Sequence, residues 1–190
     1  MINIYTDGSH SKKRCGWGFI AIENNGQKYS NSGIALTGTN QRMELLAVVQ
    51  ALDWWAAEHN ASYDDVTIHT DSAYVYNCWA DKWFVNWISN GWKNTKGIDV
   101  ANQDLWKLLI PFFTNPHVFF NKVKGHSGHS YNELADKLAT GSITSTDELK
   151  KKKKNDKINI ELSEILLDYS MKKFSVDETI RRIRKACNCG

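Results

Sequence analysis

Alternation between apolar and polar positions divides the first 140 residues into short strand-like and helix-like segments. Apolar or alternating runs typical of β-strands cover residues 2–6, 16–23, 27–35, 66–70 and 117–123. Asn24-Asn25-Gly26 separates the second run from the third and predicts a tight turn. Pro111 and Pro116 bracket the start of the last run. The chain therefore opens with a predicted meander of three antiparallel strands.

Helical spacing of apolar residues appears at three places among these strands. The longest predicted helix covers residues 40–58, with Thr39 or Asn40 able to cap its start. Shorter helices are predicted over residues 72–80 and 132–140, and Gly141 ends the second of them. This order of elements predicts an α/β fold. Its five-stranded mixed sheet is flanked by helices, with the first three strands antiparallel and the first, fourth and fifth parallel.

A change of composition near residue 141 separates the chain into two parts. All eight tryptophans precede residue 142, whereas the stretch that follows is polar and contains five successive lysines. Further along, apolar residues recur at helical spacing, and Ser175 to Glu178 form a capping-box signature. We expect a main domain over residues 1–141, a lysine-rich linker over 142–157 and a small helical C-terminal extension over 158–190.

Charge is distributed unevenly between these parts. The whole chain has a net charge of +3. Residues 1–141 contain 12 Lys and Arg and 13 Asp and Glu, whereas residues 142–190 contain 12 Lys and Arg and 8 Asp and Glu. The main domain therefore offers a polyanion no general attraction and must bind one with local patches or bound metal. The basic tail could bind nucleic acid or a protein partner, whereas we expect the main domain itself to be monomeric.

Cysteine content and hydropathy bear on where the protein resides. The four cysteines are too few and too irregularly spaced for a disulfide framework, so reduced thiols are expected. No apolar run approaches the roughly 18 to 20 residues that cross a bilayer, and the chain opens directly into a strand. These features predict a cytoplasmic protein.

Four acidic residues occupy the ends or beginnings of predicted elements. Asp7 and Asp71 each follow an apolar strand, and Glu44 and Asp136 lie in the opening turns of predicted helices. Sites in parallel sheets form at the carboxyl ends of strands, so Asp7 and Asp71 are expected to face one crevice. Converging carboxylates would make an oxygen-rich site suited to Mg²⁺. Taken singly, each acid could instead complement a helix N-terminus or start a turn.

Four motifs containing these acids follow one another along the chain. They are Tyr5-Thr6-Asp7-Gly8-Ser9, Thr39-Asn40-Gln41-Arg42-Met43-Glu44-Leu45, Thr70-Asp71-Ser72, and Val123-Lys124-Gly125-His126-Ser127-Gly128-His129 followed by Asn132, Glu133 and Asp136. In order and spacing they resemble the motifs of the type 1 ribonuclease H family, over about residues 1–141. The resemblance implies a ribonuclease H-like fold. It also implies a metal-dependent endonuclease that hydrolyses the RNA strand of RNA/DNA hybrids and leaves 5′-phosphate and 3′-hydroxyl ends.

The resemblance also implies roles for individual residues. Asp7, Glu44, Asp71 and Asp136 would hold two Mg²⁺ ions, for which Mn²⁺ could substitute. His126, in a glycine-containing loop before the last helix, would serve proton transfer or product departure. Glu133 would tune the same end of the site.

Contacts with the hybrid are implied at both strands. Amides at Asn40 and Gln41 would test the 2′-hydroxyl, which distinguishes RNA from DNA, while Thr39 and Arg42 would help with phosphate. Three tryptophans would pack against the DNA strand, although their helical spacing suits packing within the protein equally well. The complete implied set is Thr39, Asn40, Gln41, Arg42, Trp83, Trp87, Trp92 and Asn132.

Two other functions stay open at this point. The first is a non-catalytic nucleic-acid-binding module with the same fold, against which the four retained acids argue, because carboxylates repel phosphate. The second is a nuclease for branched or duplex DNA, which Asn40 and Gln41 beside Glu44 make less favoured.

Overall fold

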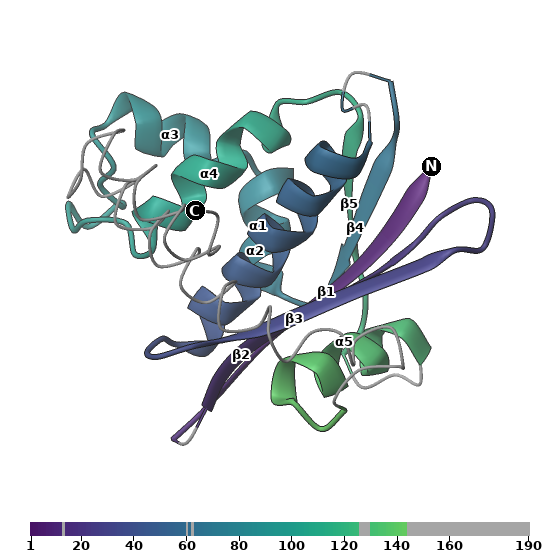
Figure 1. Cartoon of the computed structure of the whole chain (residues 1–190). Helices are drawn as coiled ribbons and strands as arrows, with labels where there is room; N and C mark the ends of the chain where they lie inside the picture. The colour runs from purple at the N-terminus through teal and green to yellow at the C-terminus, as the bar shows by residue number, and fades with distance from the viewer. Residues whose placement is uncertain (13, 60, 62, 126–129, 144–190) are drawn as a thin grey trace, which may run out of the picture. The chain divides into compact units, whose positions relative to one another are not determined.

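The structure, a computed structural model, describes residues 1–12, 14–59, 61, 63–125 and 130–143, and a five-stranded sheet lies at its centre (Figure 1). The sheet has the strand order β3-β2-β1-β4-β5. The first three strands pair antiparallel, and β1, β4 and β5 pair parallel. The predicted mixed sheet is thus confirmed. Its strands are β1 (Ile2–Ser11), β2 (Arg14–Ile22), β3 (Lys28–Ala35), β4 (Val66–Thr70) and β5 (Val118–Lys122).

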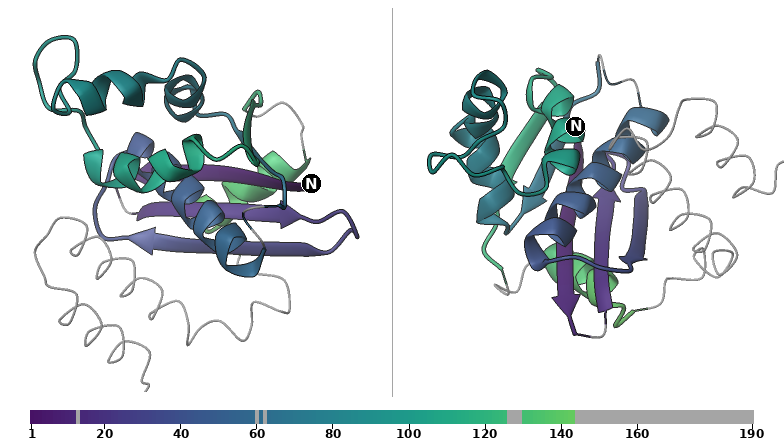
Figure 2. Two further views of the ribbon diagram at one scale, coloured as in Figure 1. Left: turned by 90° about the horizontal axis from the view of Figure 1, so that it is seen from above. Right: turned by 90° about the vertical axis from the view of Figure 1, so that its left-hand side faces the viewer.

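Helices cover both faces of the sheet (Figures 1 and 2). Helix α1 packs against β1 and β2 on one face, and α5 packs against the same two strands on the other. The helices of the described residues are α1 (Asn40–Glu58), α2 (Ala73–Ala80), α3 (Trp83–Ser89), α4 (Gln103–Phe113) and α5 (Ser130–Thr140). The predicted helical extension over residues 158–190 and most of the predicted linker lie outside the described residues.

Three residues that the sequence marks as a turn, a helix start and a helix end have these roles in the structure. Gly26 has a φ of +82° in the turn between β2 and β3, and Gln27 donates its backbone N–H to Asn25 Oδ1 at 2.7 Å. Thr39 caps α1, since its Oγ1 accepts a hydrogen bond from the Arg42 backbone N–H at 3.2 Å. After α5, Gly141 adopts a φ of +70° and closes the helix.

Two predictions about elements are wrong. Strand β1 does not end before Asp7 but continues to Ser11, because β2 pairs with it as far as the turn between Ser11 and Arg14. Pro111 does not mark the approach to β5, since it lies in the last turn of α4, a helix that the pattern analysis did not predict. Pro111 has no N–H to donate to the carbonyl of Lys107, four residues earlier, so the last turn of α4 forms with one backbone hydrogen bond fewer.

Glycines beside Asp7 allow both helices to approach the sheet closely. A Cβ atom on Gly8 would overlap the backbone of Met43 and Glu44 in α1. A Cβ atom on Gly18, the antiparallel partner of Asp7, would lie 2.6 Å from Leu138 Cβ in α5. The absence of side chains at Gly8 and Gly18 therefore brings α1 and α5 to the same level of the sheet as Asp7.

The core lies between α1, α4 and the sheet. Trp55 and Trp106 are fully buried there, with Phe19 and Ile68 contributed by the strands. Within the described part of the chain, no helix is both long and apolar enough to cross a membrane.

Candidate active site

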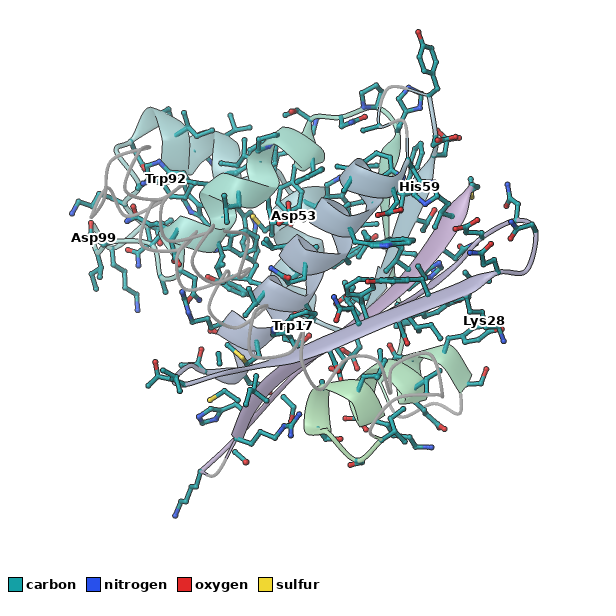
Figure 3. All side chains as sticks on the ribbon, viewed as in Figure 1. Trp17, Lys28, Asp53, His59, Trp92 and Asp99 are labelled. Carbon is teal, nitrogen blue, oxygen red and sulfur yellow. The ribbon has the colours of Figure 1, made fainter. Side chains whose placement is uncertain are left out.

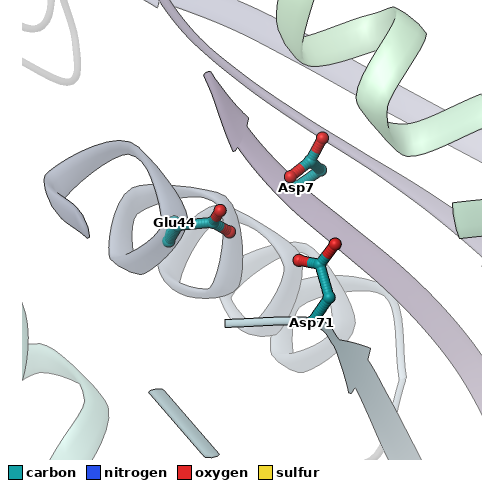
Figure 4. A group of neighbouring side chains, drawn as sticks. All are labelled: Asp7, Glu44 and Asp71. Carbon is teal, nitrogen blue, oxygen red and sulfur yellow. The ribbon is translucent and has the colours of Figure 1, made fainter. Parts of the chain in front are cut away.

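Asp7 and Asp71 occupy equivalent places on neighbouring parallel strands. The ladder between β1 and β4 ends at the pair Thr6 and Thr70, and each acid is the next residue of its chain. Both side chains point to the same crevice, as Figure 4 shows. The expected juxtaposition is therefore present, although Asp7 is within its strand and only Asp71 follows one.

Glu44 reaches the same place from α1. It lies in the second turn of the helix and is buried. The Gly8 backbone N–H donates to both Asp7 Oδ1, at 2.9 Å, and Glu44 Oε2, at 3.1 Å. One carboxylate oxygen from each of Asp7, Glu44 and Asp71 lies within 4.8 Å of the others. A single backbone amide thus holds two acids from distant parts of the chain together.

Asp136 completes the acidic cluster from α5. It lies in the middle of that helix rather than in its opening turn, because α5 begins at Ser130. It lies close enough to Asp7 for its charge to help raise the pKa of that carboxyl group. All four acids line one pocket of about 250 Å³, together with Gly8, Ser9, Asn40, Asn132 and Glu133.

Burial and mutual repulsion make these acids hard to ionise together. Burial, followed by the charges of Asp71 and Asp136, raises the pKa of Asp7 to about 8. Burial, followed by the charge of Asp7, also raises the pKa of Glu44 well above its ordinary value. The hydrogen bonds from Gly8 oppose both shifts. Without a positive charge the pocket therefore favours the protonated forms of Asp7 and Glu44.

A divalent cation fits this set of ligands. Carboxylate oxygens are hard donors of the kind that Mg²⁺ and Mn²⁺ prefer, and five carboxyl groups line the pocket, those of the four predicted acids and that of Glu133. A bound cation would offset the repulsion that raises the two pKa values. The chemistry of the pocket thus agrees with a metal-dependent site.

The RNase H family model matches residues 1–144 of this chain. The chain belongs to the RNase H family. Two of its curated relatives are ribonucleases H: that of Syntrophomonas wolfei is 45% identical over 146 residues, covering 76% of this chain and 97% of the relative. The ribonuclease H of Nitratidesulfovibrio vulgaris is 42% identical over 142 residues, which cover 73% of this chain and 86% of the relative. The predicted family is confirmed.

A solved structure supports the same conclusion for the RNase H fold. The crystal structure of a type 1 RNase H with the type 2 active-site motif is similar with a TM-score of 0.60 and 27% sequence identity. The similarity covers 74% of this chain and 71% of that one.

Two of the residues implied to contact substrate in this RNase H line the acidic pocket. Asn40 is the first residue of α1 and is exposed at the pocket. Asn132 comes from α5, is only 4% exposed, and its Oδ1 has no hydrogen-bond partner among the described residues. Gln41 and Thr39 are exposed beside Asn40 but do not line the pocket.

Arg42 is held away from the pocket by an ion pair. Its guanidinium donates to both carboxylate oxygens of Asp104, at 2.7 and 3.0 Å, and to Asn102 Oδ1 at 3.3 Å. This pairing joins α1 to the start of α4. The predicted phosphate contact of Arg42 stays a prediction, and no sequence pattern indicated the pair with Asp104.

The three tryptophans form a half-buried row along α3 and the turn after it. Trp87 lies 6.2 Å from Trp83 and 6.1 Å from Trp92 between ring centroids, and 5.4 Å from the buried Trp106. Figure 3 shows Trp92 in the part of the molecule that also carries Asp99. The row thus packs on the core and also leaves ring surface exposed, and its contact with DNA stays a prediction.

Three further residues, His126, Gly8 and Ser9, belong to the predicted or the observed site. His126 lies outside the described residues, so its role stays a prediction. The double donation from the Gly8 amide was not predicted, although a glycine directly after Asp7 is a signal for close backbone approach. Ser9 also lines the pocket and had no predicted role.

Proposed function

We propose that this protein is an endonuclease that hydrolyses the RNA strand of RNA/DNA hybrids, using two Mg²⁺ ions and leaving 5′-phosphate and 3′-hydroxyl ends. The observation that carries the proposal is the meeting of Asp7, Glu44, Asp71 and Asp136 in one pocket of an RNase H fold. Their roles as metal ligands are part of this proposal.

The acids of this pocket have a shared task in the proposed reaction. Bound there, divalent cations supply the charge that activates a water and stabilises the leaving oxygen. Asp7 is central among the proposed ligands, since the charges of Asp71 and Asp136 act on it and it shares the Gly8 amide with Glu44. Asp71 directly follows β4, and its carboxylate lies near those of Asp7 and Glu44 (Figure 4). His126 is proposed to move protons or help the product leave.

Recognition of RNA is proposed to depend on the amides at the pocket. Asn132 Oδ1 is a buried acceptor without a partner in the described residues, and a 2′-hydroxyl is a donor that would satisfy it. Asn40 offers a second amide at the pocket. An RNA strand laid across the acids would thus bring its sugars to these side chains.

A purely binding role is less favoured by the same pocket. Clustered acids raise the pKa values of Asp7 and Glu44 and repel phosphate, so they weaken both folding and binding unless a cation is held there. A module that only bound nucleic acid would gain nothing from them.

One assay tests the proposal directly. Labelled RNA/DNA hybrid, duplex RNA and duplex DNA are incubated with the protein and Mg²⁺, and the products are separated by size. We expect cleavage of the RNA strand of the hybrid only, and a loss on the order of a thousandfold for Asp71→Asn. Asp99→Asn is the control, because Asp99 is exposed and outside the pocket.

Two results would count against the proposal. Equal cleavage of the hybrid by Asp71→Asn would remove the metal assignment. Cleavage of duplex DNA in preference to the hybrid would favour the alternative nuclease activity.

A further inference from the structure

Gly125 lies beside the Asp71 carboxylate because of the way β4 and β5 end. These strands are parallel neighbours, and their ladder ends at the pair Thr70 and Lys122. The chain stays close for one residue more, since the Val123 backbone N–H donates to Thr70 O at 3.0 Å. Gly125 follows two residues later, where the chain after β5 passes Asp71.

The space that a side chain on Gly125 would need is already filled by Asp71. An ideal Cβ on Gly125 would lie 2.6 Å from Asp71 Oδ2, 3.5 Å from its Cγ and 3.6 Å from its Cβ. These are its three nearest heavy atoms outside the adjoining residues, and all belong to one side chain. Real Cβ atoms essentially never come within 3.0 Å of another heavy atom, so Oδ2 would have to move.

Backbone conformation gives no reason for a glycine at this position. The φ of Gly125 lies outside the left-handed region, unlike those of Gly26, Gly91, Gly97 and Gly141. An alanine at Gly125 would thus meet no conformational penalty of that kind. The obstacle is the Asp71 carboxylate alone among the described neighbours.

The displaced group is one of the clustered acids. Asp71 contributes the oxygen that lies within 4.8 Å of oxygens from Asp7 and Glu44 (Figure 4). Restoring even a 3.0 Å contact requires Oδ2 to withdraw by about 0.4 Å from its 2.6 Å position. Mg²⁺ demands near-ideal octahedral geometry at about 2.0–2.1 Å, so a displacement of this size matters to a ligand.

We propose that Gly125 is a positioning residue, whose missing side chain reserves the space in which the Asp71 carboxylate is held toward Asp7 and Glu44. The consequence for catalysis rests on the proposed function. The consequence for cation binding rests only on the acidic cluster, so the two can fail separately.

The test compares Gly125→Ala, Asp71→Ala and the double variant in the full-length chain. Mn²⁺ affinity is measured by isothermal titration, and the melting temperature is measured in EDTA. For Gly125→Ala we expect about 10- to 100-fold weaker Mn²⁺ binding, the range typical of residues that orient metal ligands. Its melting temperature in EDTA should not fall, because no packed core atom is disturbed.

The Asp71→Ala background identifies the cause of that loss. Asp71→Ala removes the carboxylate and leaves the Cβ atom of residue 71. That atom lies 3.6 Å from the Cβ of Gly125→Ala, which is an ordinary contact. The second substitution should then leave the remaining Mn²⁺ affinity unchanged. A further loss of tenfold or more in the double variant would show that Gly125 acts through something other than Asp71, and would overturn the proposal.

The remaining outcomes are also decisive. Unchanged Mn²⁺ affinity in Gly125→Ala overturns the proposal, whatever the nuclease assay gives. If Gly125→Ala does not fold, folding of the double variant supports the clash and its failure to fold overturns it. Weaker Mn²⁺ binding in a protein that cleaves no hybrid would support the positioning role and reject the proposed function.

Discussion

At the scale of single residues, burial and repulsion set the ionisation of the acidic pocket. Asp7 is 8% exposed and has two neighbouring acids that raise its pKa, so it keeps its proton far above the usual range. Such a residue opposes folding once it is ionised. The same burial that lowers the stability of the metal-free protein therefore suits the pocket to binding a positive charge.

The stability of the metal-free protein should fall as pH rises. The pKa of Asp7 is raised from 3.8 to about 8, so between these values the folded state holds a proton that the unfolded chain has lost. In EDTA, we expect the free energy of unfolding to be on the order of 2–4 kcal/mol lower at pH 8 than at pH 5. Urea denaturation at both pH values measures this difference.

Asp7→Asn should reduce that pH dependence and stabilise the metal-free protein at pH 8, and a smaller slope should remain because burial also raises the pKa of Glu44. Asp99→Asn, a change at an exposed carboxylate, should leave the slope as it is in the wild type. A slope as steep as that of the wild type in Asp7→Asn would show that Asp7 is not its origin.

How much of the site could be predicted depended on the kind of interaction. Each of the four acids lies in a motif, and the motifs follow one another in a recognisable order along the chain. Their convergence could therefore be predicted from the sequence. The pair of Arg42 with Asp104 was not, because a residue 62 positions away gives no local pattern. The space beside Asp71 was hidden for the same reason, since a glycine in a loop does not reveal which side chain needs its room.

At the scale of elements, the site depends on how closely two helices approach one sheet. Gly18 pairs with Asp7 and faces α5, where a Cβ would lie 2.6 Å from Leu138 Cβ and 2.8 Å from the Ala139 backbone nitrogen. The backbone of a helix cannot yield as a side chain can. The position of Asp136 therefore rests on this glycine.

Gly18→Ala should push α5 outward and destabilise the protein by about 1–3 kcal/mol, the usual cost of overfilling a packed interior. Activity on the hybrid should fall further than stability alone explains, because Asp136 moves with the helix. Chemical denaturation and the cleavage assay are the measurements. Gly26→Ala is the matched control, since its Cβ meets nothing and its positive φ costs only about 1 kcal/mol.

The Arg42 and Asp104 pair should stabilise the junction of α1 and α4. Both side chains are partly buried, at 23% and 15% exposure, and the contact is bidentate. A double-mutant cycle with Arg42→Ala and Asp104→Ala should give a coupling energy of about 1–2 kcal/mol. Additive effects would show that the pair contributes nothing.

Helix α4 shows why element prediction was incomplete. Its buried residues Leu105, Leu109 and Phe113 recur at helical spacing, yet Pro111 within the same stretch suggested an ending. The helix nevertheless continues for two residues beyond the proline. Tertiary packing of the apolar face outweighed the local signal.

At the scale of the whole molecule, the distribution of charge separates the catalytic part from the tail. Residues 1–141 are close to neutral, whereas residues 142–190 carry 12 Lys and Arg against 8 Asp and Glu. We propose that the tail adds a salt-sensitive attraction for the hybrid, and that the catalytic domain works without it.

A chain truncated after Ile143 should keep kcat and show a higher KM for the hybrid at low salt. At high salt the two KM values should converge, because screening removes the contribution of the tail. Cleavage kinetics across a series of KCl concentrations provide the check. Identical KM values at low salt would deny the tail a part in substrate binding.

Strand β1 is the middle strand of the five and has a helix on each face. The edges of a sheet can open locally while its centre persists, so fraying of β3 or β5 leaves Asp7 in place. Amide hydrogens around Asp7 should consequently be among the slowest to exchange with deuterium. On heating, the enzyme should stay competent until the molecule unfolds as a whole.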